Sequence, residues 1–475
     1  MGYSAKNIKE FVKGSGILVA SNIILKAIQF FLLPLYTNYL SPSELGVSDS
    51  ITSFTSFLFP LLVMAFDSAF SAFFYEEDGK EYQTRVFNTV FFFLAVQGLI
   101  PVIMILGSGF ISQVLFGTAK YSLGITLALF SVSTNLWYLS FALLTRMENR
   151  MRTFALINVS SSTTMILLNI LFVSVLKWGY MALLASSCIV NVLQVALYLI
   201  TCKVSIRRSY IDKPLFGKMF RYAVPLIPMT VSTWILNMSD RYMLLYFCGE
   251  AEVGIYGIGG RFITVLSVVI SGISTAYTSF AFKSHRDEAA KEMFADVVKL
   301  LFVFLAGICA TVALFGKEII YLMTSSEYHS SYLLLPSMMF SQLAYALYTF
   351  TGYGIAFKKK PKYYFYSVTA GAVINVVLNV FLLPEMGAVG AAFTTLIGTV
   401  LMFAISYYYS QKLYPCHYGI IKISLIFIML YMISILFRET ILPIKIGIWF
   451  VAAAGTIGIY YPTIKAVIVS LRSKN

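Results

Sequence analysis

The chain has few charged residues and few of the side chains that bind metals or act as nucleophiles. Only 12% of its 475 residues are Asp, Glu, Lys or Arg, and it has three histidines and five cysteines. No two cysteines have CxxC spacing, and His285, His329 and His417 lie far apart in the sequence. No metal site, Ser/His/Asp arrangement or glycine-rich phosphate loop can be recognised. The sequence therefore predicts a protein with no enzymatic activity, no metal and no cofactor.

The chain is rich in hydrophobic residues. Hydrophobic residues make up 59% of the chain and the mean hydropathy is +0.81, whereas about a quarter of the residues of a soluble domain are charged. A helix crosses a bilayer with about 20 apolar residues, so we predict an all-α polytopic membrane protein with about 14 transmembrane helices. The candidate spans are 14–36, 47–71, 86–107, 121–145, 153–175, 178–202, 222–246, 253–281, 295–315, 329–352, 363–384, 387–411, 418–437 and 443–468.

The net charge of +14 is distributed unevenly between the predicted loops. Basic residues gather in alternate loops, such as 146–152, 203–221 and 358–362, while the loops 37–46 and 247–252 have none. This is the positive-inside pattern, which predicts that both termini are cytoplasmic. The basic residues are thus explained as signals that orient the protein in the membrane. We therefore predict no nucleic-acid partner.

Two motifs occur twice in the same order. The segment 39–47 resembles 247–255, and 208 residues separate Glu44 from Glu252. A second pair places Asn169 shortly before Gly179 and Asn379 shortly before Gly387, and the two glycines are again 208 residues apart. Six spans return the chain to its starting side, so the two repeats are parallel. Parallel repeats are typical of transporters whose substrate site lies between the two halves.

The repeat and the loop charges together predict the domain organisation. An N-terminal six-helix bundle covers 1–202, a basic cytoplasmic linker covers 203–221, and a C-terminal six-helix bundle covers 222–412. Two extra C-terminal transmembrane helices follow in 413–475. Because only a short polar break at 438–445 separates these last segments, a re-entrant pair is the alternative.

Five charged residues stand out inside predicted spans: Lys26, Asp67, Asp240, Arg241 and Arg261. A charge in the bilayer costs about 2.5–3.5 kcal/mol on insertion scales, so such residues usually face a cavity. We predict that the three cations line a substrate cavity and bind an anion such as phosphate. The alternatives are that Lys26 pairs with Asp67 or extends to the membrane surface, that Arg241 lies at the interface, and that Arg261 pairs with Asp240 or a backbone carbonyl. The two acids are candidates for ion coupling or for structural pairing.

Asparagines also recur within the spans. Asn169, Asn237, Asn375 and Asn379 are the most prominent. Buried amides need hydrogen-bond partners, and most amides in transmembrane helices bond to a neighbouring helix. The alternative is contact with the hydroxyl groups of a sugar.

The order and spacing of several motifs resemble a known family. These motifs lie at 14–16, 34–36, 40–46, 225–228, 237–242, 254–257, 375–379 and 387–392. Over nearly the whole chain the sequence resembles a Wzx-type polysaccharide or O-antigen flippase of the multidrug/oligosaccharidyl-lipid/polysaccharide (MOP) exporter superfamily.

The resemblance implies a MATE-like fold of two six-helix bundles around a cationic cavity. It also implies that undecaprenyl-pyrophosphate-linked oligosaccharide repeat units are flipped across a bacterial inner membrane by alternating access. Such units feed O-antigen, capsule or exopolysaccharide synthesis. The expected partners are the lipid-linked oligosaccharide, the bilayer, and the polymerase and chain-length proteins of the same pathway.

Three other functions remain as alternatives. A lipid II flippase of the same superfamily would have a similar cavity, and the sequence separates it poorly. A drug/cation antiporter needs intramembrane acids, but here the intramembrane bases outnumber them. A membrane glycosyltransferase or polymerase would need catalytic residues in a large outer loop, and the outer loops here are short.

Overall fold

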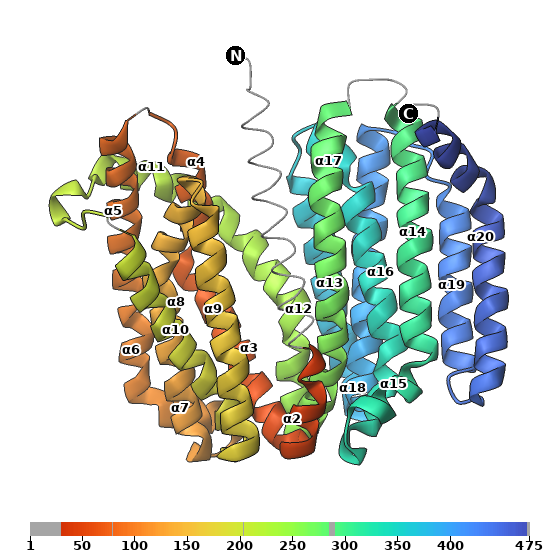
Figure 1. Cartoon of the computed structure of the whole chain (residues 1–475), viewed down its shortest axis with the longest axis horizontal. Coiled ribbons are helices and arrows are strands. Elements are labelled where there is room, and N and C mark those ends of the chain that lie inside the picture. Colours follow the sequence, from red (N-terminus) through yellow and green to blue (C-terminus); the bar gives the residue numbers. More distant parts are fainter. Residues whose placement is uncertain (1–29, 78, 203, 285–289, 473–475) are drawn as a thin grey trace. The chain divides into compact units, whose positions relative to one another are not determined.

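The computed structural model describes residues 30–77, 79–202, 204–284 and 290–472, which divide into an N-terminal unit, Met1–Trp234, and a C-terminal unit, Ile235–Asn475 (Figure 1). The described residues are nearly all helical and contain no strand. Within the described residues, ten helices are long and apolar enough to cross a membrane, and α19 is a shorter apolar helix. The predicted all-α membrane fold is therefore confirmed. The predicted domain boundaries stay a prediction, and Lys26 lies outside the described residues.

The described part of the N-terminal unit contains five helices of 18 residues or more, several short ones and the start of α12. Its elements are α2 (Leu33–Tyr39), α3 (Pro42–Val63), α4 (Phe66–Phe73), α5 (Lys80–Gln97), α6 (Leu99–Met104), α7 (Ser108–Phe116), α8 (Ser122–Met147), α9 (Met151–Ile170), α10 (Met181–Thr201), α11 (Lys213–Ala223) and the start of α12 (Ile227–Cys248).

One predicted span of this unit is interrupted. The sequence predicts one helix over 47–71, but α3 ends at Val63 and α4 begins at Phe66, with Met64 and Ala65 between them. Both of these residues have left-handed backbone angles, with φ of 49° and 56°. Left-handed backbone cannot continue a right-handed helix. Asp67 consequently lies on the short helix α4, with an exposed side chain.

Part of the predicted basic linker is itself helical. Asp212 accepts a hydrogen bond from the backbone N–H of Leu215 at 2.9 Å, and this cap begins helix α11. The apolar side chains Leu215 and Met219 are buried, while the basic side chains Lys218 and Arg221 are exposed. Helix α11 therefore lies against α4 as an amphipathic element.

The C-terminal unit contains the end of α12 and the longest helices of the chain. In Figure 1, α13, α14 and α16 stand side by side, and α16 also packs against α18. The helices are α13 (Glu250–Ser284), α14 (Ala290–Leu314), α15 (Gly316–Met323), α16 (Leu335–Thr351), α17 (Tyr353–Phe357), α18 (Lys362–Leu413), α19 (Ile420–Leu436) and α20 (Leu442–Arg472).

Helix α18 is a hairpin of two helical arms. Gly387 has φ 53° and ψ −136°, which breaks the helix in its middle. The arms approach closely, because a Cβ added to Gly371 would lie 2.7 Å from the carbonyl oxygen of Gly398. The predicted spans 363–384 and 387–411 are therefore two antiparallel helices.

The sequence repeat has a structural counterpart inside each unit. In the N-terminal unit, the carboxylate of Glu44 lies against Gly179, which has φ 58°. In the C-terminal unit, Glu252 lies against Gly387 and accepts a hydrogen bond from the backbone N–H of Ala388 at 2.8 Å. Each repeat thus joins its own two motifs through a carboxylate and a positive-φ glycine.

We expect Gly387→Ala to destabilise the protein by about 1–3 kcal/mol, because a Cβ is disfavoured at this φ. The added Cβ would also lie 2.7 Å from Glu252 Oε2. Thermal unfolding in detergent measures the effect. Gly307→Ala is the control, since that helical glycine has no atom within 4 Å of an added Cβ. Equal melting temperatures for the two variants would contradict this account of the hairpin.

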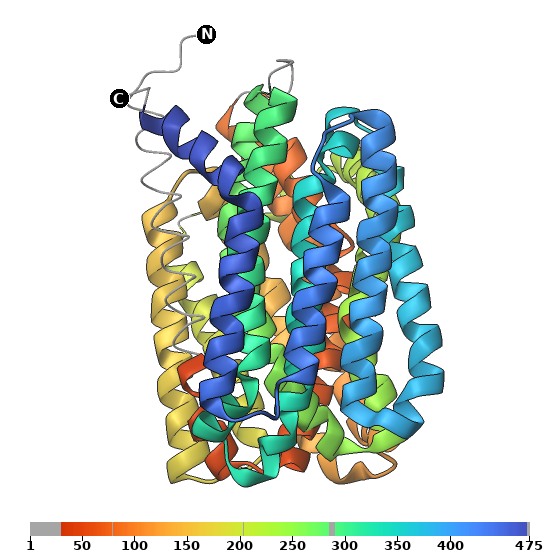
Figure 2. The ribbon, with the colours of Figure 1, turned by 90° about the vertical axis from the view of Figure 1, so that its right-hand side faces the viewer.

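The last two helices run side by side and antiparallel along the C-terminal unit (Figure 2). Lys445 on α20 has no exposed side-chain surface and bonds both carboxylate oxygens of Glu318 on α15, at 2.7 and 2.9 Å. Trp449 donates a hydrogen bond to Thr311 on α14 at 2.8 Å. These contacts hold α20 against α14 and α15, and whether the two segments cross the membrane fully or form a re-entrant pair stays a prediction.

Candidate functional site

A polar groove of about 440 Å³ lies in the C-terminal unit between α12, α13 and α16. The α13 residues that line it recur at helical spacing, so they share one face of that helix. None of the lining side chains carries a charge. They are Asn237, Ser267, Ile270, Ser271, Ser274, Thr275, Thr278, Gln342, Tyr345 and Thr349.

Several groove hydroxyls already donate to their own helix. Ser267 donates to the carbonyl of Ile263 at 2.8 Å, and Thr275 donates to the carbonyl of Ser271 at 2.9 Å. Their oxygen atoms retain the capacity to accept a hydrogen bond. Gln342 Oε1 is buried and has no donor among the described residues. The groove therefore presents acceptors suited to a ligand with many hydroxyl groups.

Arg241 lies one helical turn beyond the groove on α12. Its guanidinium donates to the carbonyl of Asn237 at 3.4 Å and lies 5.8 Å from the ring centre of Tyr256. A Cβ on Gly260 would come within 3.2 Å of Nη2, so the glycine leaves space for the guanidinium. Arg241 forms no ion pair with any carboxylate that the structure describes. Its charge is thus available to an anion.

Asp240, the preceding residue, points into a buried polar cluster. Its side chain is 1% exposed and accepts three hydrogen bonds. Asn379 donates to Oδ1 at 2.7 Å, while Tyr256 and Thr395 donate to Oδ2 at 2.7 and 2.6 Å. These donors come from α13 and from both arms of α18, so Asp240 connects three helical segments.

Two further residues extend this cluster. Asn375 lies one turn before Asn379 on α18, and its amide is 3.4 Å from the hydroxyl groups of Thr394 and Thr395. Thr394 in turn donates to the amide oxygen of Asn379. Both asparagines are fully buried. In this structure they bond between the two arms of the α18 hairpin.

We expect Asp240→Asn to destabilise the protein. An amide has one acceptor oxygen for the three donors that surround it, and each unsatisfied buried group costs about 1–3 kcal/mol. Asp67→Asn is the control, because Asp67 is exposed and surface substitutions stay within about 0.5 kcal/mol. Thermal unfolding of both variants tests this. If Asp240→Asn melts at the wild-type temperature, the cluster does not have the structural role assigned to it.

The structure brings together only some of the residues predicted from the sequence. Asp240, Asn375 and Asn379 meet in the cluster, and Arg241 and Asn237 are neighbours on α12. Arg261 follows Gly260 on α13 and is partly exposed.

Two of the predicted residues that the structure describes belong to the N-terminal unit. Asp67 is exposed on α4. Asn169 is 4% exposed and donates to the hydroxyl of Tyr36 at 2.9 Å. That bond joins α9 to α2, so Asn169 makes a contact between helices in this structure.

The groove hydroxyls and Gln342 were not predicted from the sequence. A signal was present, because Ser267, Ser271, Ser274 and Thr278 place a polar stripe on the otherwise apolar span 253–281. Serine and threonine are common in transmembrane helices, where they bond to their own backbone. The stripe therefore becomes meaningful only when α16 is seen beside it.

The sequence matches the models of two known protein families. Residues 11–281, more than half of the sequence, match the family described as Polysaccharide biosynthesis protein. This chain belongs to the polysaccharide biosynthesis protein family. Residues 225–381 also match the MatE family. The resemblance to the MOP exporter superfamily is thereby confirmed.

Solved structures share the fold of this polysaccharide biosynthesis family member. A lipid II flippase, MurJ, in an inward closed conformation has a TM-score of 0.74 and 19% identity over 95% of this chain and 99% of its own. An inward-facing multidrug resistance MATE transporter of the MOP superfamily has a TM-score of 0.60 and 16% identity, with coverages of 87% and 95%. A MOP superfamily transporter from Pyrococcus furiosus has a TM-score of 0.57 and 15% identity, with coverages of 87% and 96%. No curated protein matches the sequence.

Proposed function

We propose that this chain flips undecaprenyl-pyrophosphate-linked oligosaccharide repeat units from the cytoplasmic to the outer leaflet of a bacterial inner membrane, with both of its termini in the cytoplasm. The units would supply O-antigen, capsule or exopolysaccharide synthesis, and the movement would occur by alternating access. The groove in the C-terminal unit carries the proposal, because its lining consists mainly of hydroxyl and amide groups without charge. Oligosaccharides bind through such groups. The family description supports the same class of product.

The cations complete the proposed recognition of the substrate. Arg241 lies one turn from Asn237, which lines the groove. An arginine binds phosphate through two parallel hydrogen bonds. We place the sugars in the groove and the diphosphate at Arg241, with Arg261 as a further cation of the C-terminal unit, while Lys26 stays a predicted substrate-binding cation outside the described residues.

A drug/cation antiporter is the less suitable function for this groove. A cationic drug would need an acidic side chain among the lining residues, and none of them is acidic. Asp240 is close in sequence, but its carboxylate is buried and already accepts three hydrogen bonds. For Asp240 these bonds favour the structural role over ion coupling, while the exposed Asp67 is the better candidate for coupling.

Deleting the gene and analysing the lipids tests this function. We expect loss of the surface polysaccharide and accumulation of undecaprenyl-linked repeat units in the inner leaflet. Accumulation of lipid II with normal polysaccharide would instead assign a lipid II flippase. Normal levels of both lipids with altered drug susceptibility would assign an exporter. The polymerase and chain-length proteins of the same pathway are the expected partners.

A further inference from the structure

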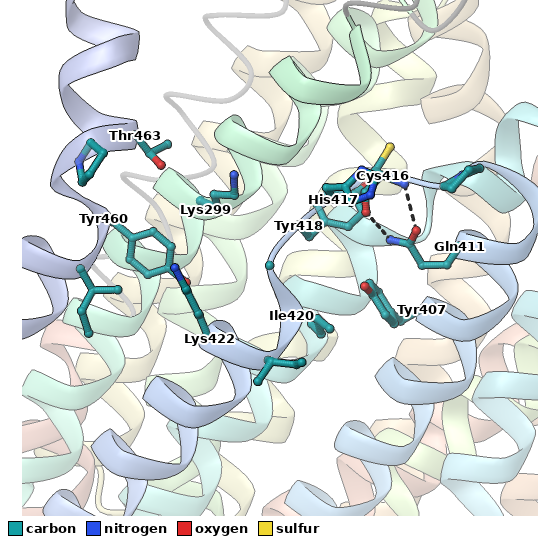
Figure 3. Close-up of a pocket in the computed structure, with 15 residues that line it drawn as sticks. Lys299, Tyr407, Gln411, Cys416, His417, Tyr418, Ile420, Lys422, Tyr460 and Thr463 are labelled. Atoms are coloured by element: carbon teal, nitrogen blue, oxygen red, sulfur yellow. Dashed lines mark hydrogen bonds between the residues drawn. The ribbon is translucent and has the colours of Figure 1, made fainter.

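We propose that the C-terminal unit holds the phosphate head group of an anionic membrane phospholipid in a second pocket, apart from the sugar groove. This pocket has a volume of about 810 Å³ and lies where the chain passes from α18 to α19. Residues from α14, the end of α18, the 414–419 connection, α19 and α20 line it (Figure 3). The site does not depend on which substrate the protein transports.

Basic side chains dominate the charge of this pocket. Lys299, His417 and Lys422 line it, and no acidic residue does. Lys299 is held by Asp296 at 2.8 Å, one turn earlier on α14. Lys422 and His417 are exposed and form no ion pair with a described carboxylate. The remaining positive charge favours an anion.

A buried hydroxyl in the same pocket points to a ligand independently of the charges. Tyr460 is 4% exposed, and its hydroxyl has no hydrogen-bond partner among the described residues. The side chain of Lys422 extends toward this tyrosine (Figure 3). Buried polar groups in proteins almost always have partners. A phosphate oxygen beside Lys422 would accept a hydrogen bond from Tyr460 and neutralise the ammonium group.

The wall of the pocket is preformed. The amide of Gln411 donates to the carbonyl of Cys416 at 2.7 Å and accepts from the N–H of Cys416 at 2.9 Å (Figure 3). Cys416 and Tyr418 are both 3% exposed. The connection between α18 and α19 is thus fixed, so a ligand would not have to order it on binding.

The apolar surface beside the pocket identifies the anion as a lipid. Ile421 is 74% exposed and Leu425 is 64% exposed, one turn further along α19. Exposed apolar side chains of this kind suit acyl chains and not a soluble anion. Both ends of the α18 hairpin lie at the pocket's end of the unit, next to the lysine-rich segment 358–362. Basic segments at a membrane surface attract anionic lipids.

The test compares lipids with the same acyl chains on the purified full-length protein. Phosphatidylglycerol should raise the melting temperature and stay bound in native mass spectrometry, whereas phosphatidylcholine should do neither. Lys422→Gln should weaken retention about fivefold, the effect of one basic residue at an anionic membrane. Tyr460→Phe should weaken it as well. Lys412→Gln is the matched control, because Lys412 is exposed nearby but does not line the pocket.

Three results would overturn the lipid site. The first is equal retention of the two lipids. The second is unchanged retention in Lys422→Gln, which removes an exposed side chain and should fold normally. The third is equal stabilisation by inorganic phosphate alone, which would show a site for a soluble anion.

Discussion

Glu318→Leu should destabilise the protein by about 3 kcal/mol, the lower end of the effect of removing one partner of a buried ion pair, because Lys445 is buried but Glu318 is 35% exposed. The ammonium group of Lys445 would then be left without its carboxylate at a position with no exposed side-chain surface. Lys445→Met should cost less, because the side chain of Glu318 is 35% exposed and remains partly hydrated. Denaturant or thermal unfolding in detergent measures both variants.

The double variant Glu318→Leu/Lys445→Met provides the decisive comparison. It should recover most of the stability lost in Glu318→Leu, because an apolar pair often replaces a buried ion pair at little cost. If the double variant is no more stable than Glu318→Leu, then the loss does not come from an unpaired buried charge.

A neighbouring pair offers a matched surface control. Lys317 donates to Glu439 at 2.8 Å, but the two side chains are 33% and 49% exposed. This hydrogen bond from Lys317 lowers the pKa of Glu439 below its usual value. Exposed pairs contribute at most about 1 kcal/mol. Lys317→Gln should therefore have a much smaller effect than Glu318→Leu.

Arg241→Gln should reduce flipping at least about tenfold, since a hydrogen bond to a charged group contributes about 1.5–3 kcal/mol. The protein should stay folded, because Arg241 forms no ion pair with a described carboxylate. Transport of a fluorescent lipid-linked oligosaccharide in proteoliposomes measures the rate, and the melting temperature reports folding. Arg241→Lys should recover flipping only partly, because a lysine cannot make the same two parallel hydrogen bonds.

Arg438→Gln serves as the control for this loss of one positive charge. Arg438 lies in the connection between α19 and α20, next to Glu439. The Arg438→Gln substitution should leave the flipping rate unchanged. Arg261→Gln tests the second predicted cation in the same assay, and wild-type flipping in that variant would remove Arg261 from the site.

The sequence predicted the helices well because bilayer thickness sets their length. Even the hairpin at Gly387 was predicted as two spans, since no single span could accommodate residues 362–413. The break at Met64–Ala65 was missed, because neither residue is a glycine or a proline. Backbone strain at such a site depends on tertiary packing, which residue type does not reveal.

The sequence predicted the members of the repeat but not their contacts. Glu252 and Gly387 were recognised because they recur in the second half, like Glu44 and Gly179 in the first. Their contact joins segments 135 residues apart, and a single sequence carries no signal for such a distance. For the same reason the sequence did not indicate that Glu318 is the partner of Lys445. From the sequence, Lys445 was interpreted only as part of a polar break between two spans.

Purified protein in proteoliposomes provides the most direct test of the central claim. Undecaprenyl-pyrophosphate-linked oligosaccharide is placed in one leaflet, and its appearance in the other is followed with and without the protein. We predict that flipping requires the protein. We also predict that the flipping rate falls in Gln342→Leu, because this substitution removes the buried hydrogen-bond acceptor of the groove. If lipid-linked oligosaccharide stays in its leaflet while a drug or lipid II is moved, the proposed function is wrong.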